Sequence, residues 1–525
     1  MKLREESKKN RIKTTKLGGI DMIVGLFGSS GHMGIKTLEE FLKILEVNKV
    51  KVLLLKNEKK RNKLVKKLAK ANKGRVEIYY GDIANKEDVI TIVDKCDYVF
   101  NLAAVIPPRS DKRPDLSYLA NEVGPNNIIE ALEERPNVKF IDITSVALYG
   151  HRNAKHPFER VGDPLLPSVF DVYAAHKLRG EYHILESNIP YFAVIRQTAM
   201  VYLEMLNANM SDGLMFHTPF NDPLEWSTAE DSGLLMANII REDIAGHLNF
   251  DNFWRKVFNL GAGEANRISG YETLEGGFKL IGGTTKRFFE PHFNVVRNFH
   301  GGFYYDGDDL ENLFHYQRDN IGEYWAKVKK KYPYYGMAKI VPSGLIKKFA
   351  IKRLFKDSNS PQYWYKHNDI ARLTAFYGSK QAYENLSKKW EDFKMWDYLA
   401  VQNVKNYEPI DYGFDIDKSD KEITIEDLQN VAKLHGGKLL SQEFKKGDVY
   451  QTLKWENSDG EVFFARPYTV LRGGHWFNPL YKSNTWDFDR LSKKDAIFAA
   501  FWYDSHDKEE NNCYYMNERY EAKIK

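Results

Sequence analysis

The stretch that decides the fold is Ile23–Glu39, which reads IVGLFGSSGHMGIKTLE. Its apolar start stops at three glycines, Gly28, Gly31 and Gly34, and apolar residues then recur at helical spacing. The pattern predicts a buried strand, a tight turn and a helix. Glycines let the chain reverse sharply and let a pyrophosphate approach the bare backbone, while the helix N-terminus offers unpaired N–H groups. Taken alone, the triplet also fits an ordinary strand–loop–helix that binds no nucleotide.

The composition is that of a globular protein of more than one domain. A chain of 525 residues exceeds a single hydrophobic core, so we expect two or three domains. A net charge of +5 is too small to argue for a nucleic-acid partner. No apolar run reaches the roughly 18–20 residues of a membrane span, and the N-terminus lacks the apolar core of a signal peptide. Two cysteines, Cys96 and Cys513, cannot form a disulfide framework, which fits a cytoplasmic location.

Short apolar segments alternate with amphipathic ones over the first half of the chain. Such alternation predicts an α/β domain with a doubly wound parallel sheet. After the glycine turn, the segments expected to form strands are 50–55, 76–80, 98–102, 140–145 and 191–196.

The residues after the second expected strand bear on the cofactor. An NAD-preferring site usually carries an acidic residue there, which bonds the ribose hydroxyls. Here the chain reads Lys56-Asn-Glu-Lys-Lys-Arg61, and these cations would attract a 2′-phosphate. The segment therefore favours NADP over NAD, although such cations also occur on any solvated helix. Asp82 could accept a hydrogen bond from the adenine amino group, and the small residues Ala103 and Ala104 would let the backbone pass beneath a cofactor.

The candidate catalytic residues follow at a strand end and on the next helix. Ser145 ends the expected strand 140–145, where ligands bind in such sheets. Tyr173 and Lys177 are four residues apart, which places the phenol and the ammonium on one helix face. We expect the ammonium to lower the pKa of the phenol, which is otherwise too high for acid–base work at neutral pH.

These motifs together resemble the extended short-chain dehydrogenase/reductases of the NAD(P)-dependent epimerase/dehydratase family, over about residues 20–270. The matching landmarks, in family order and at family spacing, are GSSGHMG at 28–34, GD at 81–82, NLAA at 101–104, TSVALYG at 144–150, YAAHK at 173–177, AED at 229–231 and VFNLGAGEANRIS at 257–269. The resemblance implies a Rossmann-type fold, a nicotinamide cofactor and a Ser145–Tyr173–Lys177 catalytic group.

The resemblance also assigns a set of cofactor contacts. The residues expected to contact NADP, or NAD as the alternative, are Gly28, Ser29, Ser30, Gly31, His32, Met33, Gly34, Lys56, Arg61, Asp82, Ile83, Leu102, Ala103, Ala104, Tyr173 and Lys177.

Departures from the family pattern narrow the expected chemistry. Sugar-nucleotide dehydratases of this family carry an Asp-Glu pair after the catalytic hydroxyl residue, where this chain has Val146-Ala147. Gln197-Thr198-Ala199 after the strand 191–196 also differs from sugar-nucleotide members, and the usual proline is missing. We therefore expect an NADPH-preferring oxidoreductase that reduces a carbonyl or oxidises an alcohol. The alternatives are an epimerase or isomerase of a sugar nucleotide or related hydroxylated substrate, and a nucleotide-sensing scaffold.

The second half of the chain lies outside this resemblance. Segments 310–330 and 364–396 are predicted as amphipathic helices, and Asp306, Asp308 and Asp309 fit a helix N-terminus better than a calcium loop. Residues 425–481 resemble small zinc-ribbon-like repeats but lack their cysteines, so we expect no metal there. The aromatic residues expected to stabilise this unit instead are Trp455, Phe463, Phe464 and Trp476.

The expected organisation has four parts. These are a flexible basic arm at 1–17, an NAD(P)-binding Rossmann domain with substrate-binding elements at 18–270, a mostly helical aromatic-rich region at 271–415 and a small α+β domain at 416–525. The aromatic content favours a small-molecule substrate of apolar or ring-bearing character. Family members often form homodimers through a four-helix contact, and the sequence leaves the oligomeric state open.

Overall fold

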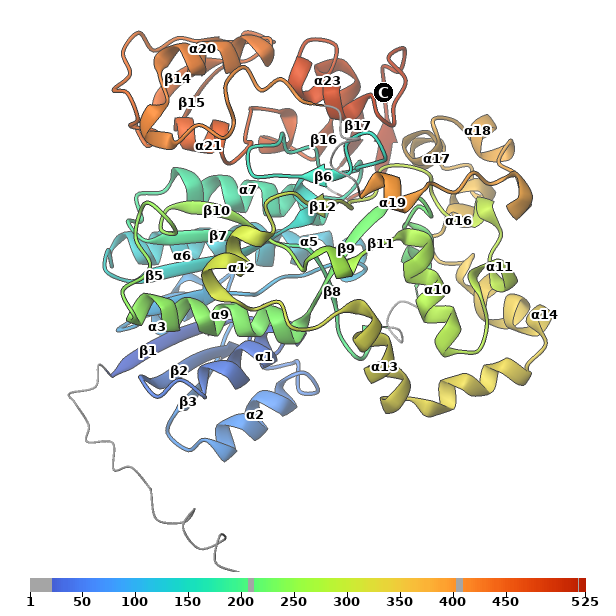
Figure 1. The fold of residues 1–525 in the computed structure, drawn as a ribbon, viewed down its shortest axis with the longest axis horizontal. Helices are drawn as coiled ribbons and strands as arrows, with labels where there is room; N and C mark the ends of the chain where they lie inside the picture. The colour runs from blue at the N-terminus through green and yellow to red at the C-terminus, as the bar shows by residue number, and fades with distance from the viewer. Residues whose placement is uncertain (1–20, 206–211, 403–408, 518) are drawn as a thin grey trace, which may run out of the picture.

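A seven-stranded parallel sheet forms the centre of the N-terminal half in the computed structural model, which describes residues 21–205, 212–402, 409–517 and 519–525 (Figure 1). The strand order is β10-β7-β5-β4-β1-β2-β3, and every pairing in it is parallel. The strands are β1 (Met22–Phe27), β2 (Val47–Leu54), β3 (Val76–Tyr80), β4 (Tyr98–Asn101), β5 (Lys139–Ser145), β7 (Phe192–Gln197) and β10 (Lys256–Leu260). This arrangement confirms the predicted α/β, doubly wound Rossmann-type fold.

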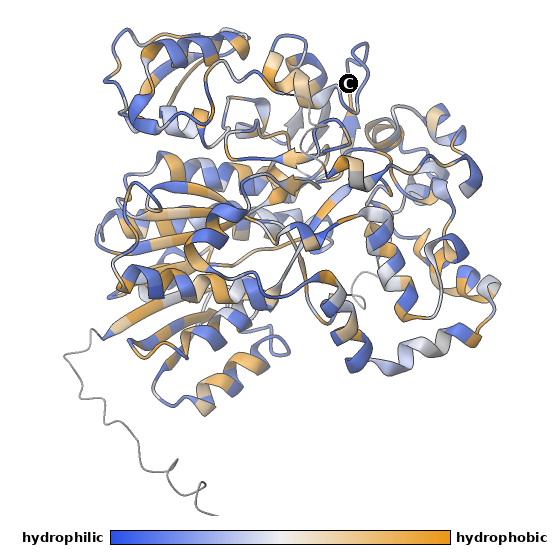
Figure 2. Cartoon of the chain, in the orientation of Figure 1, coloured by the Kyte–Doolittle hydropathy of each residue, from blue (hydrophilic) through white to orange (hydrophobic). Residues whose placement is uncertain are grey.

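Helices cover both faces of this sheet. On one face α1 packs against α9, and on the other α3 and α7 both pack against α6. These helices are α1 (His32–Phe41), α2 (Asn62–Ala71), α3 (Lys86–Val93), α4 (Arg109–Lys112), α5 (Pro114–Tyr118), α6 (Gly124–Glu133), α7 (Val172–Glu186) and α9 (Ala229–Ile244). Because both faces are covered, strands β5 and β7 are buried along almost their whole length. Figure 2 shows hydrophobic residues along the strands of the sheet, interspersed with hydrophilic ones.

The carboxyl ends of the strands point toward most of the helices of residues 270–384, whereas α12 lies against β10 and α9 (Figure 1). These helices are α10 (Gly270–Leu280), α11 (Thr285–Phe288), α12 (Asp308–Phe314), α13 (Ile321–Lys331), α14 (Ser343–Ile346), α15 (Lys352–Leu354), α16 (Pro361–Lys366), α17 (Ile370–Tyr377) and α18 (Lys380–Glu384). Two small sheets join this region to the Rossmann half. Their strands are β6 (Phe158–Glu159) with β12 (Phe303–Tyr304), and β8 (Ala199–Val201), β9 (Pro223–Thr228) and β11 (Arg267–Ser269).

The prediction of two long helices in this region, at 310–330 and 364–396, is wrong, because each segment is interrupted. His315 adopts a left-handed conformation with φ of 49° and ends α12, after which Asn320 caps α13. Gly378, with φ of +85°, ends α17, and Ser379 caps α18. Asp308 and Asp309 do lie in the first turn of α12, as predicted.

The last part of the chain holds the remaining elements: α19 (Tyr398–Val401), α20 (Ile425–Leu434), α21 (Pro467–Leu471), α22 (Phe488–Leu491), α23 (Ala496–Trp502), β13 (Lys438–Leu439), β14 (Leu453–Glu456), β15 (Val462–Ala465), β16 (Thr485–Trp486), β17 (Tyr514–Met516) and β18 (Ala522–Ile524). Thr424 and Asp427 form a capping box on α20, and β14 pairs with β15 in an antiparallel hairpin. Trp455 and Phe463 are buried, but Phe464 is 59% exposed because alternate residues of β15 face opposite ways. Phe464 was therefore wrongly placed in this core.

Buried apolar residues of this last part are continuous with the core below α7. One cluster includes Val194 of the central sheet, Leu178 of α7, Leu471 of α21 and Trp486 of β16. Within the described ranges no helix combines the length and apolar character needed to cross a bilayer. The predicted basic arm, residues 1–17, lies outside the residues that the structure describes.

Candidate active site

Two glycines of the turn are required by very close contacts, and the third, Gly31, is less crowded. Gly28 has φ of +78°, and a Cβ there would lie 2.4 Å from the backbone of Leu102 at the end of β4. A Cβ on Gly34 would lie 2.2 Å from the carbonyl oxygen of Gly28. At Gly31 the nearest atom would be that same oxygen, at 3.3 Å. Gly28 and Gly34 therefore allow the close approach of β1, β4 and α1, whereas Gly31 leaves its backbone open.

The N-terminus of α1 is suited to an anion. Its N-cap residue, Gly31, provides no side-chain hydrogen bond, and the first turn holds no acidic residue. The unpaired N–H groups and the positive end of the helix dipole lie where Ser30, Gly31 and His32 line a cavity of about 1150 Å³. The residues present thus fit the pyrophosphate of a dinucleotide.

Ser145, Tyr173 and Lys177 line the same cavity. Ser145 ends β5, and its hydroxyl oxygen accepts a hydrogen bond from the Ala147 backbone N–H at 3.1 Å. Tyr173 and Lys177 lie on α7 and are 8% and 2% exposed. The Lys177 ammonium donates to the carbonyl oxygen of Ile143 at 2.7 Å, which fixes it against β5. The fold therefore brings the three predicted catalytic residues and the glycine turn to one space.

The electrostatics differ from the expected lowering of the tyrosine pKa. Burial raises the pKa of Tyr173 to about 12, and a hydrogen bond with Ser145 offsets only part of that effect. Burial also lowers the pKa of Lys177, while the Asp142 and Glu181 carboxylates oppose that shift. The Tyr173 hydroxyl therefore stays protonated at neutral pH. It is therefore a proton donor rather than a base in this state.

The predicted cofactor residues divide into two groups by position. Those that line the cavity are Ser30, Gly31, His32, Met33, Gly34, Arg61, Leu102, Ala104, Tyr173 and Lys177. Those that do not line it are Gly28, Ser29, Lys56, Asp82, Ile83 and Ala103. Gly28 acts through the turn geometry described above. The exposed Asp82 accepts a hydrogen bond from the Ala84 backbone N–H at 3.0 Å, which ties its carboxylate to its own loop.

Two of the four cations after β2 lie at the cavity, and the other two, Lys56 and Lys59, do not line it. Lys60 and Arg61 line the cavity with exposed side chains, whereas Lys56 is exposed but does not line it. Glu58, in the same segment, accepts a hydrogen bond from Arg109 at 2.9 Å. The cavity therefore meets positive charge at this edge. Lys60 was not among the predicted contact residues, although it lies in the basic run from which Lys56 and Arg61 were chosen.

The second half of the chain supplies a large part of the cavity wall, which the sequence did not indicate. The lining residues from this half are Thr273, Leu274, Gly277, Phe278, Asn298, Phe299, His300, Trp325, Lys331, Ser358, Asn359, Tyr363, Asp369, Arg372, Phe376 and Met516. His300 also contacts the catalytic helix, since its Nδ1 lies 3.2 Å from an oxygen of Asp171. The other oxygen of Asp171 caps α7 by accepting from the Ala174 N–H at 2.9 Å. The second half thus contacts α7 two residues before Tyr173.

A comparison of the chain with known protein families agrees with the geometry of this cavity. Residues 25–204 match the NAD dependent epimerase/dehydratase family. The match contains the glycine turn, Ser145, Tyr173 and Lys177, and it confirms the family resemblance for this segment. A curated relative, D-erythronate dehydrogenase of Haemophilus influenzae, is 28% identical over 133 residues, which are 25% of this chain and 39% of that protein. The matched part thus spans about two fifths of that relative's length.

Solved structures with a similar fold were also found. A dTDP-glucose 4,6-dehydratase from Bacillus anthracis in complex with NAD has a TM-score of 0.48 and 16% identity, covering 60% of this chain and 98% of that one. A UDP-glucuronic acid 4-epimerase from Bacillus cereus in complex with UDP-glucuronic acid and NAD has a TM-score of 0.45 and 19% identity, covering 60% and 99%.

Proposed function

We propose that the chain is an NAD(P)-dependent oxidoreductase that reduces a carbonyl group, with NADPH as the preferred cofactor. The observation that supports it most is that Ser145, Tyr173 and Lys177 line one cavity together with the open glycine turn. The family of residues 25–204 is described as NAD dependent, and the curated relative is a dehydrogenase. Val146 and Ala147, in place of an acid pair after Ser145, favour simple redox chemistry over the elimination of water.

The proposed chemistry follows from the positions and charges of the three residues. A bound nicotinamide would supply the hydride. Ser145 is placed to donate a hydrogen bond to the substrate carbonyl oxygen, which orients the carbonyl and polarises it. As the C–H bond forms, the Tyr173 hydroxyl gives its proton to that oxygen and yields the alcohol. The Lys177 ammonium, fixed on Ile143, then stabilises the phenolate that Tyr173 has become.

The protonation state of Tyr173 suits the reductive direction that we propose. A hydroxyl whose pKa is raised to about 12 carries its proton at neutral pH and can donate it. The direction itself is part of the proposal, and the turnover assay tests it.

The test is turnover by the full chain. Oxidation of NADPH is followed by absorbance with a panel of ketones and aldehydes, and NADPH binding is titrated separately by fluorescence. The proposal requires binding together with substrate-dependent oxidation. Binding without any turnover would favour the nucleotide-sensing scaffold, and NAD(P) retained through purification with no net turnover would favour the epimerase.

Replacing Gly31 by alanine should weaken cofactor binding, whereas replacing Gly28 by alanine should lower the stability of the fold. We expect Gly31→Ala to weaken NADPH binding about tenfold, roughly 1.4 kcal/mol, because its Cβ would stand where the phosphates approach. The Gly31→Ala variant should lose much less stability than Gly28→Ala, since φ at Gly31 is −75° and its nearest contact would be 3.3 Å, with the Gly28 carbonyl oxygen. Gly28→Ala should instead lower the melting temperature, because of its positive φ and the 2.4 Å contact. Thermal unfolding and an NADPH titration measure both effects, and equal loss of stability in the two variants would contradict this assignment.

Lys60 and Arg61 should set the preference for NADPH. We expect the double variant Lys60→Ser/Arg61→Ser to raise the Kd for NADPH about tenfold or more, because a lost charge-assisted hydrogen bond costs roughly 1.5–3 kcal/mol. Binding of NADH, which lacks the 2′-phosphate, should not change. Lys56→Ser is the matched control, since Lys56 is an exposed cation of the same segment that does not line the cavity. If Lys56→Ser weakens NADPH binding as much, a general charge effect explains the result instead.

A further inference from the structure

Residues 324–356 combine a strong positive charge with exposed apolar side chains, and we call them the basic segment. The segment holds ten cations and no aspartate or glutamate, whereas the whole chain has a net charge of only +5, so the rest of the chain is net negative. Figure 1 shows it along an outer edge of the molecule, from α13 to α14. The ten cations are Lys327, Lys329, Lys330, Lys331, Lys339, Lys347, Lys348, Lys352, Arg353 and Lys356.

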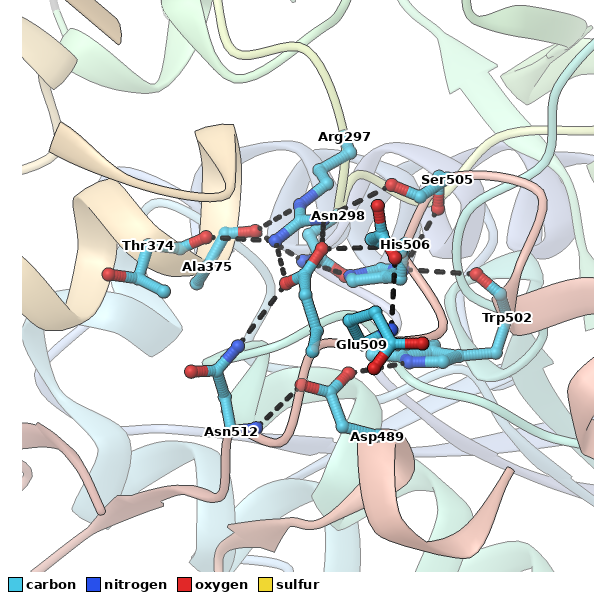
Figure 3. A network of polar contacts seen from close by, with 12 residues as sticks. Arg297, Asn298, Thr374, Ala375, Asp489, Trp502, Ser505, His506, Glu509 and Asn512 are labelled. Atoms are coloured by element: carbon cyan, nitrogen blue, oxygen red, sulfur yellow. Dashed lines mark hydrogen bonds and ion pairs between the residues drawn. The ribbon is translucent and has the colours of Figure 1, made fainter. Parts of the chain in front are cut away.

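Most of these cations have no acidic partner. Lys327, Lys331 and Lys347 each form an ion pair with an acidic residue outside the segment. The other seven are exposed and form no ion pair with the residues that the structure describes. Arg297, a buried cation of the same half, is different, because it donates to two carbonyl oxygens of α17 at 2.9 Å and pairs with Glu510 at 2.6 Å (Figure 3). The seven exposed cations are thus available to an anionic partner.

Four large apolar side chains of the basic segment are exposed as well. Tyr334 is 56% exposed, Ile340 84%, Leu345 48% and Phe349 65%. Apolar surface left in water is unfavourable, and exposed apolar side chains gathered in one segment are typical of a surface that binds a partner or a membrane. Tyrosine rings in particular favour the headgroup level of a bilayer.

Positive charge alone does not single out this segment. Residues 59–75, around α2, hold nine cations and no acidic residue. The large apolar side chain exposed in that run, Leu64, lines the cavity described above. The basic segment differs because it adds four exposed apolar side chains to its cations.

Other apolar residues hold the basic segment against the protein. Val328 is fully buried in a cluster with Val201. Ile351 and Leu354 are buried in a cluster with Phe278. One side of the segment is therefore docked on the body of the protein, and the exposed apolar side chains belong to its other side.

The helical part of the segment shows this division clearly. Residues 343–354 are continuous, because α14 runs into a π-helical turn (Lys347–Ile351) and then into α15. Spacings of three and four residues put one set of side chains on the outer face. The large exposed side chains of that face are Leu345, Lys348, Phe349, Lys352 and Arg353. Cations mixed with large apolar residues are typical of helices that lie in the interface of a membrane.

The combination favours an anionic membrane over other partners of a basic surface. A nucleic acid would neutralise the cations, but its backbone and bases offer no apolar phase for the aliphatic Ile340 and Leu345. A second copy placed segment to segment would bring ten further positive charges, which repel. A bilayer with anionic lipids accepts both kinds of side chain, since headgroups bind the cations and the acyl boundary takes the apolar groups.

We propose that the basic segment binds the surface of membranes that contain anionic lipids, with Ile340, Leu345 and Phe349 inserted between the headgroups. The apolar runs considered from the sequence were spanning ones. This contact is of another kind, because the segment would lie on the membrane without crossing it. The proposal does not depend on the proposed function.

The first experiment measures sedimentation of the full chain with vesicles. One set is phosphatidylcholine alone, and the other contains about 30% phosphatidylserine. We expect at least about tenfold tighter binding to the anionic vesicles, because each cation near such a surface contributes roughly fivefold. Raising the salt from about 0.15 M to about 1 M shortens the Debye length from about 8 Å to about 3 Å and should remove most of that preference.

Two double variants separate the apolar and the charged contributions. We expect Ile340→Ser/Phe349→Ser to weaken binding to the anionic vesicles about tenfold, and Lys348→Glu/Lys352→Glu at least about twentyfold. All four side chains are exposed, so thermal unfolding should stay as in the wild type.

The matched controls lie in the last part of the chain. Val462→Ser/Phe464→Ser changes apolar side chains that are 49% and 59% exposed, and Lys445→Glu/Lys446→Glu reverses two exposed cations. Both should bind vesicles as the wild type does. An equal loss in a control and in its partner variant would overturn the proposal, because any exposed residue of that kind would then matter.

Other outcomes would also overturn the proposal. These are no preference for anionic vesicles, or a preference that Ile340→Ser/Phe349→Ser leaves unchanged. A duplex DNA of about 20 base pairs, titrated in the same buffer, tests a nucleic-acid partner, and tighter binding of DNA than of vesicles would assign the surface to that partner. Self-association that the serine variant abolishes, without vesicle binding, would assign it to a second copy. Turnover and NADPH binding, measured in parallel, report separately on the proposed function.

Discussion

Tyr173→Phe is expected to lower kcat for NADPH-dependent carbonyl reduction by about a thousandfold, within the range of roughly 10²–10⁴ that a positioned proton donor contributes. The variant removes only the hydroxyl, and the Tyr173 ring is buried in the wall of the cavity, so packing should be kept. The Kd for NADPH should change less than about twofold. Steady-state kinetics and a fluorescence titration of NADPH give the two numbers.

The pH profile separates a proton donor from a residue that only shapes the cavity. Because the pKa of Tyr173 is raised to about 12, its hydroxyl is protonated across the neutral range. The rate of reduction should therefore be flat with pH there, while the reverse oxidation should rise with pH as the phenolate becomes accessible. A reduction rate that climbs with pH would contradict the assignment.

Tyr202→Phe is the matched control for this variant. Tyr202 also lines the cavity, and its ring stacks on His32 with centroids 3.7 Å apart. Loss of its hydroxyl keeps that stack, so kcat should be unaffected. A similar loss of activity in both variants would show that any tyrosine hydroxyl in this cavity matters equally, and Tyr173 would then have no special role.

The central sheet could be predicted from sequence because its signals are local. Strands buried on both faces are continuous apolar runs, so β3 was predicted with its exact bounds and β1, β2, β4, β5 and β7 within a few residues, whereas β10 was not predicted as a strand. The glycine spacing and the four-residue spacing of Tyr173 and Lys177 are local as well. These patterns placed the three candidate catalytic residues and the turn at one edge of the sheet.

The opposite wall of the cavity could not be predicted, because its geometry comes from distant contacts. Asn298 has φ of 60°, and its amide is fixed by partners 77 and 208 residues away. Asp171 contacts the second half only through partners distant in sequence, such as His300, which is 129 residues away. The break at Gly378 was visible as a glycine, but helical periodicity on both sides of it outweighed that signal.

Arg196→Met is expected to destabilise the protein by about 3–5 kcal/mol, the usual cost of leaving one partner of a buried ion pair uncompensated. Arg196 and Glu181 are both fully buried and form a bidentate pair between β7 and α7. Glu181 also accepts a hydrogen bond from Thr144 at 2.7 Å and lies 3.1 Å from Nε2 of His475. Urea unfolding at neutral pH measures the loss.

The pH dependence of the free energy of unfolding is a second test of the Arg196–Glu181 pair, and the direction of the change can be stated in advance. Burial would raise the pKa of Glu181, but Arg196 and His475 together lower it to about 2. The ionised carboxylate therefore adds stability above its unfolded pKa near 4.5, and this contribution is lost as the pH falls toward 2. The difference in stability between wild type and Arg196→Met should shrink over that window. A difference that stays constant would show that Arg196 acts through packing alone.

Two further variants separate burial from charge. Arg113→Met breaks an exposed pair with Asp115, whose side chains are 56% and 51% exposed, and should cost less than about 1 kcal/mol. The double variant Arg196→Met/Glu181→Leu removes the uncompensated charge and should recover part of the loss. Full recovery is not expected, because Arg196 also donates to the Tyr149 hydroxyl at 2.6 Å and to the Gly473 carbonyl oxygen at 2.5 Å. Since Gly473 follows α21, the bond to its carbonyl oxygen joins the central sheet to the last part of the chain, and its loss should lower the stability of both together.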